Sequence, residues 1–233
     1  MGKSWKKAGK MEAAQKKGAM FTKLAREIAV AAKLGGGDPA ANSRLKLAIA
    51  EARVASCPKD TIERAIKKGT GQLDDGTIIE EIVYEGYGPH GVGIIVECQS
   101  DNRNRTVSEL RNLFKSHGGN LGETGAVAWM FERVGLIQGK KAKVGDPEEE
   151  AIEVGANEVF AEEDGTYSFY TAPEDLGSVS TAMQSRGWEV SVCELSFKAK
   201  DTTEISEAQK AEVVELLEAL EDNDDSHRVH ATV

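Results

Sequence analysis

The amino-acid sequence predicts an α+β protein in which an N-terminal three-helix domain is followed by two ferredoxin-like α/β domains, one inserted in the other. Apolar residues recur at helical spacing over the first 70 positions, and they alternate or form short strand-like runs afterwards. The segment GTGQLDDGT between these regions is typical of a linker, which indicates a boundary near residues 70–78. After residue 134 the predicted elements follow the order β-α-β-β-α-β, which is typical of the split ferredoxin-like arrangement.

Three helices are predicted in the first third of the chain. The first covers residues 11–34, because its apolar residues are three or four positions apart and three glycines follow it. The second starts where Asp38 can cap its N-terminus and Pro39 can occupy its first position. The third follows Pro58 and ends near Gly69. Residues 1–18 contain few large apolar side chains, so we interpret them as a mobile arm that is helical in part.

The rest of the chain alternates between strands and helices. The final helix and strand have no core of their own, so we expect them to return to the first α/β domain and complete it. The predicted domains are 1–75, 76–133 plus 203–233, and the insertion 134–202. The predicted elements are strands at 79–85, 92–99 and 126–133, a helix at 104–117, strand 134–138, helix 147–155, strands 158–161 and 166–171, helix 173–186, strand 189–196, helix 206–221 and strand 228–231.

Charge is distributed unevenly along the sequence. The whole chain has 29 lysines and arginines against 39 aspartates and glutamates, a net charge of −10. Residues 1–72 hold 16 of the basic residues and 6 of the acidic ones, so this third carries +10 and the remainder −20. Such asymmetry indicates contact with a polyanion, whereas mutual attraction of the two parts is the structural alternative.

The candidate nucleic-acid contacts are the cations of the arm, of the polar stripe of the first helix and of the third helix. A basic stripe opposite an apolar stripe is also the ordinary solvated face of a helix. Trp5 could either stack on a base or anchor the arm to the helices. The candidates are Lys3, Trp5, Lys6, Lys7, Lys10, Lys16, Lys17, Lys23, Arg26, Lys33, Lys59, Arg64, Lys67 and Lys68.

A second basic motif lies in the body, in the segment SDNRNRT. Its Asp and Asn can cap the helix that follows, and Arg103 and Arg105 fall in the first turn, where the helix dipole disfavours cations. Two interpretations stay open. The arginines form a secondary phosphate contact, or they make a structural ion pair with the acidic body.

The sequence matches the motifs of common enzymes and cofactor sites poorly. The loop GYGPHG at 86–91 fits a dinucleotide fingerprint by letter, but a strand follows it where a helix is required. Three separate cysteines and four histidines lack metal-ligand spacing, so we expect free thiols, no metal and no cofactor. A small-ligand enzyme using the 86–91 loop is the distant alternative. The sequence has no long apolar run or signal core, so we expect a cytoplasmic protein that does not contact membranes.

Three long segments resemble one known family. They are FTKLAREIAVAAKLGGGDPAANSRLKLAIAEARVASCPKDTIERAIKKGTG, YEGYGPHGVGIIVECQSDNRNRT and HGGNLGETGAVAWMFERVG. The sequence is similar to the YebC/PmpR family, also typified by mitochondrial translational activators of cytochrome oxidase. It departs from the family's Gly-His-Ser-Lys-Trp start, where it reads Gly-Lys-Ser-Trp-Lys-Lys.

This resemblance implies a function in gene expression. It implies a cytoplasmic, non-enzymatic regulator that binds DNA to control transcription. The alternative within the family is a ribosome-associated translation factor that binds structured RNA. We expect nucleic acid as the partner of the basic third, and protein contacts or restraint as the role of the acidic body.

Overall fold

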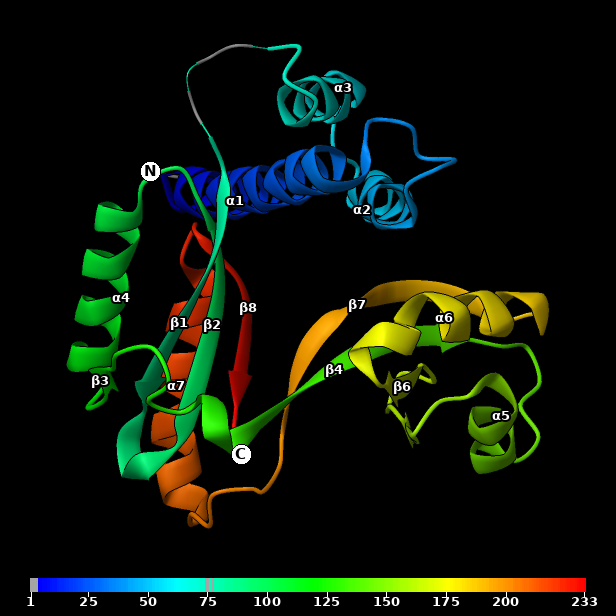
Figure 1. The fold of residues 1–233 in the computed structure, drawn as a ribbon. Helices are drawn as coiled ribbons and strands as arrows, with labels where there is room; N and C mark the ends of the chain where they lie inside the picture. The colour runs from blue at the N-terminus through cyan, green and yellow to red at the C-terminus, as the bar shows by residue number, and fades with distance from the viewer. Residues whose placement is uncertain (1–3, 74–75, 77) are drawn as a thin grey trace.

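A computed structural model describes residues 4–73, 76 and 78–233 (Figure 1). In this part of the chain, three helices precede two four-stranded antiparallel sheets, each covered by two α-helices. The arrangement confirms the predicted α+β class. The helices lie along one side of the molecule, and the two sheets lie side by side below them in Figure 1.

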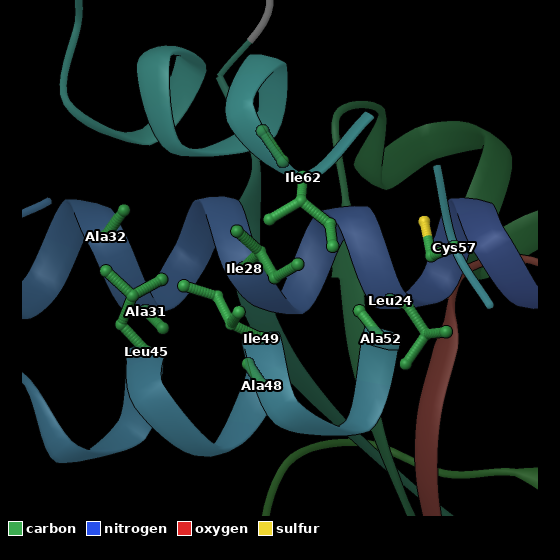
Figure 2. Packing of buried hydrophobic residues seen from close by; sticks show 11 residues of the cluster. Leu24, Ile28, Ala31, Ala32, Leu45, Ala48, Ile49, Ala52, Cys57 and Ile62 are labelled. Carbon is green, nitrogen blue, oxygen red and sulfur yellow. The ribbon is translucent and has the colours of Figure 1, made fainter. Parts of the chain in front are cut away.

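The N-terminal helices are α1 (Ser4–Gly35), α2 (Ser43–Val54) and α3 (Lys59–Gly69). Helix α1 begins at Ser4, earlier than the predicted Met11, and α3 follows Pro58 as predicted. Figure 2 shows α1 between the other two helices, with Ile28 at the centre of their shared core. Leu45 of α2 and Ile62 of α3 reach this core from opposite sides. Burial of such side chains contributes about 1.5–3 kcal/mol each, which fixes the positions of the three helices.

The prediction that Asp38 caps the second helix was wrong. Asn42 is the N-cap of α2, because its side-chain oxygen accepts a hydrogen bond from the Leu45 backbone N–H at 3.0 Å. Its Nδ2 also donates to the carbonyls of Ala31 and Gly36 at the end of α1, at 2.8 and 2.9 Å. An amide can do both, whereas a carboxylate only accepts. Asp38 instead closes a turn by accepting from the Ala40 backbone N–H at 2.9 Å.

The first sheet has the strand order β3-β1-β2-β8. Its strands are β1 (Glu80–Tyr87), β2 (Gly93–Ser100), β3 (Asn120–Leu121) and β8 (Ser226–Ala231). Helices α4 (Arg103–Ser116) and α7 (Glu207–Asp222) share one apolar core with it, centred on Ile94, Phe114 and Leu216. Strand β8 pairs with β2, so the last helix and strand of the chain belong to this sheet.

The second sheet has the order β5-β6-β4-β7, the split arrangement in which the first and third strands of the unit are neighbours. Phe169 and Met183 lie at the centre of its core, packed beside Trp188. Its elements are β4 (Phe131–Lys140), α5 (Pro147–Val154), β5 (Glu158–Ala161), β6 (Tyr167–Thr171), α6 (Leu176–Ser185) and β7 (Glu189–Ala199). Short 3-10 turns span Pro89–Gly91, Ala128–Met130 and Pro173–Asp175.

The predicted strands 126–133 and 134–138 form one strand, β4, which starts only at Phe131. Residues before it form a loop, because the buried carboxylate of Glu85 accepts hydrogen bonds from the backbone N–H groups of Gly125, Val127 and Ala128, each at 2.8 Å. Burial disfavours the charged form of Glu85, but these three bonds outweigh it and lower its pKa. The predicted limit between residues 133 and 134 therefore falls inside a strand.

Candidate nucleic-acid interface

The cations in the second half of α1 point toward the body. Lys23 Nζ donates to the Glu221 carbonyl at the end of α7, and Lys33 Nζ donates to the Ile79 carbonyl at 3.3 Å. Arg26 donates to the Asp224 carbonyl and lies 2.9 Å from the carboxylate of Asp225. Burial lowers the pKa of Lys23, although the neighbouring carboxylates raise it. These three candidate contacts thus hold the helical region against the acidic body.

Asp225 is the centre of the first junction. Its carboxylate is almost fully buried and accepts from Thr106 Oγ1 at 2.7 Å and from Ser100 Oγ at 3.1 Å. Arg105 joins Arg26 at the same carboxylate, at 2.9 Å. Burial opposes the charge on Asp225, but the hydrogen bonds and the two arginines outweigh it, so its pKa is lowered. Arg105 therefore makes an ion pair within the body.

Glu27 is the centre of a second junction, which the sequence analysis missed. This buried residue of α1 accepts both Nε and a terminal nitrogen of Arg44, at 2.7 and 2.9 Å. It also accepts from Gln99 of β2 at 2.6 Å, and His227 of β8 lies 3.3 Å away. An acidic residue on the buried side of a basic helix is the signal that could have pointed to it. The junction connects α1, α2 and the first sheet.

Arg103, the other arginine of the SDNRNRT motif, is also paired within the body. Arg103 Nε lies 2.6 Å from the carboxylate of Glu80 on β1, and its side chain is exposed. Asn102 caps α4 by accepting from the Arg105 backbone N–H at 3.1 Å. Solvent screens ion pairs between exposed side chains, so the Arg103–Glu80 pair adds little to stability. The structure thus places both arginines at contacts inside the acidic body.

The cations of α3 have different surroundings. This helix lies on the side of α1 that faces away from the two sheets (Figure 1). Lys59, Arg64 and Lys67 are exposed, and Lys68 is partly buried. Lys59 lies 3.5 Å from Glu63 on the same helix, an exposed pair with little energy. We name these four cations, Lys59, Arg64, Lys67 and Lys68, the α3 basic face.

A groove of about 400 Å³ runs between α1 and α3. Thr22 and Arg26 line it from α1, and Thr61, Arg64 and Lys68 line it from α3. The other lining residues are Phe21, Ala25, Ala29 and Ala65 of the two helices, with Ile79 and Asp101 of the body. Near its start on α1, Lys17 is exposed and its Nζ lies 5.5 Å from the centre of the Phe21 ring. The groove brings together candidate residues from two helices that the sequence analysis treated separately.

The remaining candidate contacts belong to the N-terminal arm. Lys3 lies outside the described residues. Residues from Ser4 onward belong to α1, but the side chains of the other arm candidates are not described. These are Trp5, Lys6, Lys7, Lys10 and Lys16.

The glycine-rich loop at 86–91 joins the antiparallel strands β1 and β2, as predicted. Within it, Gly88 N–H donates to the Val92 carbonyl at 2.8 Å, and His90 and Gly91 have positive φ angles. Cys57 and Cys98 are buried thiols, and burial raises the pKa of Cys98 to about 12. Over the described ranges, none of the helices combines the length and apolar character that a membrane span needs.

Fold and surface charge together define a basic three-helix region held against an acidic body of two α/β sheets. Comparison with known families identifies the same parts. Residues 2–72 match the TACO1/YebC protein N-terminal domain, and residues 79–233 match the TACO1/YebC second and third domain. The chain belongs to the TACO1/YebC family.

Individual relatives agree with this assignment. A probable transcriptional regulatory protein of Bdellovibrio bacteriovorus is 66% identical over 233 residues, covering 100% of both chains. One from Persephonella marina is 48% identical over 87% of this chain and 81% of its own length. The crystal structure of a conserved hypothetical protein from Aquifex aeolicus, 44% identical, superposes with a TM-score of 0.83 over 92% of this chain and 89% of the other.

Proposed function

We propose that this protein is a non-enzymatic regulator of gene expression that acts in the cytoplasm by binding nucleic acid, and that its target is DNA. The observation that carries the proposal is that three cations of the α3 basic face, Lys59, Arg64 and Lys67, are exposed on a helix that lies on the far side of α1 from the two sheets (Figure 1). Cations in that position are available to phosphates. The names of the relatives support a role in transcription.

The acidic body has a restraining role in this proposal. It engages Lys23 and Arg26 through the end of α7 and Asp225, so these cations are neutralised in the free protein. Nucleic acid is then recognised first by α3. Protein partners are assigned to the exposed acidic surface of the two sheets.

A ribosome-associated translation factor is the second candidate. The α3 basic face consists of three lysines and one arginine on an 11-residue helix. Lysine is a flexible point charge that contacts phosphates, and phosphate contacts do not select a base sequence. Structured RNA, which proteins recognise largely by shape and phosphates, would suit such a surface.

The test is the identity of the nucleic acid bound in cells. Ultraviolet crosslinking, followed by purification of the protein and sequencing of DNA and RNA separately, is expected to recover discrete DNA regions. Selection from random duplexes should then yield a site preferred by roughly a thousandfold or more at physiological salt. Recovery of ribosomal RNA alone, with sedimentation on ribosomes that resists DNase and not RNase, would replace the DNA target by the second candidate.

A further inference from the structure

We propose that the groove between α1 and α3 binds the sugar-phosphate backbone of a single nucleic-acid strand. This inference rests on the proposed function, because it assigns one part of the basic helical region to direct phosphate contact. It also specifies the form of the nucleic acid, an unpaired strand.

The lining of the groove has the chemistry that a phosphodiester requires. Arg64 and Lys68 are one helical turn apart on α3, so both side chains lie along the same wall. Arg26 brings a third cation from the α1 wall, and Thr61 offers a hydroxyl donor. Asp101 is the acid among the lining residues, and it is paired with Arg105 at 3.1 Å. Because the charge of Arg26 is shared with Asp225, the positive potential where a phosphate would lie comes mainly from the α3 wall.

Arg64 is the cation best placed for this contact. Among the residues that the structure describes, no carboxylate lies within ion-pair distance of it, and its side chain is exposed. Its planar guanidinium can present two parallel N–H donors to one phosphate. Arg26 differs because its charge is already shared with Asp225 at 2.9 Å. The α3 wall is therefore expected to supply most of the binding energy.

The shape of the groove favours one strand over a duplex. Three alanines from the two helices are among its lining residues, so a ligand can approach the helix backbones closely at these positions. The side chains of packed helices interdigitate, so the groove is an open furrow along the outside of the contact between α1 and α3, with a volume of about 400 Å³. An extended single strand can bend into such a furrow, whereas a duplex is stiff over this length and would contact cations outside the furrow, such as Lys59 and Lys67. The two forms of nucleic acid would thus use different cations of the same helix.

The experiment compares two double variants of the full-length protein that remove the same charge from the same helix. Arg64→Gln with Lys68→Gln alters the groove, and Lys59→Gln with Lys67→Gln alters the outer side. Each is titrated against a fluorescein-labelled oligothymidylate of about 12 nucleotides, a typical length for single-strand binding sites. An unlabelled random duplex competes in parallel, and the titrations are repeated at several salt concentrations. Thermal melting verifies that both variants fold.

The groove variant should bind the single strand on the order of tenfold more weakly, and its salt slope should decrease by about 1 to 1.5 because two phosphate contacts are lost. The outer variant should change by no more than about twofold. Equal losses, a larger loss in the outer variant, or preference for the duplex would overturn the groove proposal while nucleic-acid binding stands. No salt-dependent binding of either probe by the unaltered protein would overturn both proposals.

Discussion

Helices α1 and α3 both carry lysines and arginines, yet their cations have opposite surroundings. Lys23 and Arg26 of α1 are partly buried and bind carbonyls and a carboxylate of the body. Lys59 and Lys67 of α3 extend into solvent, and the Lys59 side chain is 87% exposed. The two sets of cations therefore have different roles. Those of α1 hold the helical region against the body, and those of α3 form an exposed basic surface.

Removing the carboxylate at the centre of the first junction should have the largest effect on the stability of the protein. Asp225→Ala leaves Thr106 and Ser100 without their acceptor and leaves Arg26 and Arg105 without their shared partner. We expect the free energy of unfolding to decrease by about 2–4 kcal/mol, measured by urea denaturation. Asp222→Asn, an exposed change in the same segment, is the control and should cost less than about 0.5 kcal/mol. A loss below about 1 kcal/mol for Asp225→Ala would contradict the structural role.

Two partly buried groups near the second junction should respond to pH in opposite directions. Burial and the nearby Arg228 lower the pKa of His227 to about 4. Between pH 6.5 and 4 the unfolded chain therefore binds a proton that the folded chain does not bind. The free energy of unfolding decreases as the pH falls through this range. Burial raises the pKa of Glu194 to about 7. Between pH 4.5 and 7 the folded chain therefore retains a proton that the unfolded chain has lost. The free energy of unfolding decreases as the pH rises through this range. Each contribution is at most about 3.4 kcal/mol.

Variants separate these two contributions. With His227→Asn, the free energy of unfolding should decrease as pH rises from 4.5 to 7, because Glu194 then dominates. With Glu194→Gln, it should increase over the same window. Urea denaturation at several pH values measures both slopes, and the unaltered protein should lie between them. Parallel profiles for the two variants would show that these groups do not control stability.

The paired cations of α1 should matter to folding more than the exposed ones of α3. We expect Lys23→Gln with Arg26→Gln to lower the free energy of unfolding by about 1–2 kcal/mol, because Asp225 loses one of its two arginines. Changing Lys16, Lys23, Arg26 and Lys33 together to Gln should also destabilise the protein, whereas a purely solvated basic stripe would predict almost no change in stability. Thermal melting in the same buffer checks this, and an unchanged midpoint would argue that these contacts are incidental.

The smallest effect on folding is expected at α3. Changing the three exposed members of the α3 basic face, Lys59, Arg64 and Lys67, to Gln should shift the free energy of unfolding by no more than about 0.5 kcal/mol. The same variant should lose on the order of tenfold or more in affinity for nucleic acid, with a shallower dependence on salt. Gel-shift titrations measure the affinity. If binding were retained in full, the α3 basic face would not be the interface.

Much of the fold follows from local sequence patterns. The helical spacing in the first third, the alternation in the strands and the β-α-β-β-α-β order each reflect short-range chemistry, and the corresponding elements are present. Long-range contacts account for the differences. Asn42 caps α2 because it also reaches the end of α1, and β4 begins late because Glu85 binds the backbone of the preceding loop.

The candidate site was harder to predict for a related reason. Helical geometry correctly separates polar from apolar positions on α1, but it cannot show that the polar stripe faces an acidic body. That body contributes Asp225, which is about 200 positions away in the chain from Arg26. The same limitation hid Glu27, whose partners come from α2, β2 and β8. The groove required the relative placement of two helices.

The position of Asp225 along the chain also sets an order of events during synthesis. Every strand of the second sheet, and both arginines that bind Asp225, are translated before this residue and β8 exist. At about 5–20 residues per second, the 120 positions between Arg105 and Asp225 take on the order of ten seconds. During that interval Arg26 lacks the carboxylate of Asp225, and the first sheet lacks its edge strand β8. A nascent chain therefore presents more unpaired positive charge on α1 than the finished protein does.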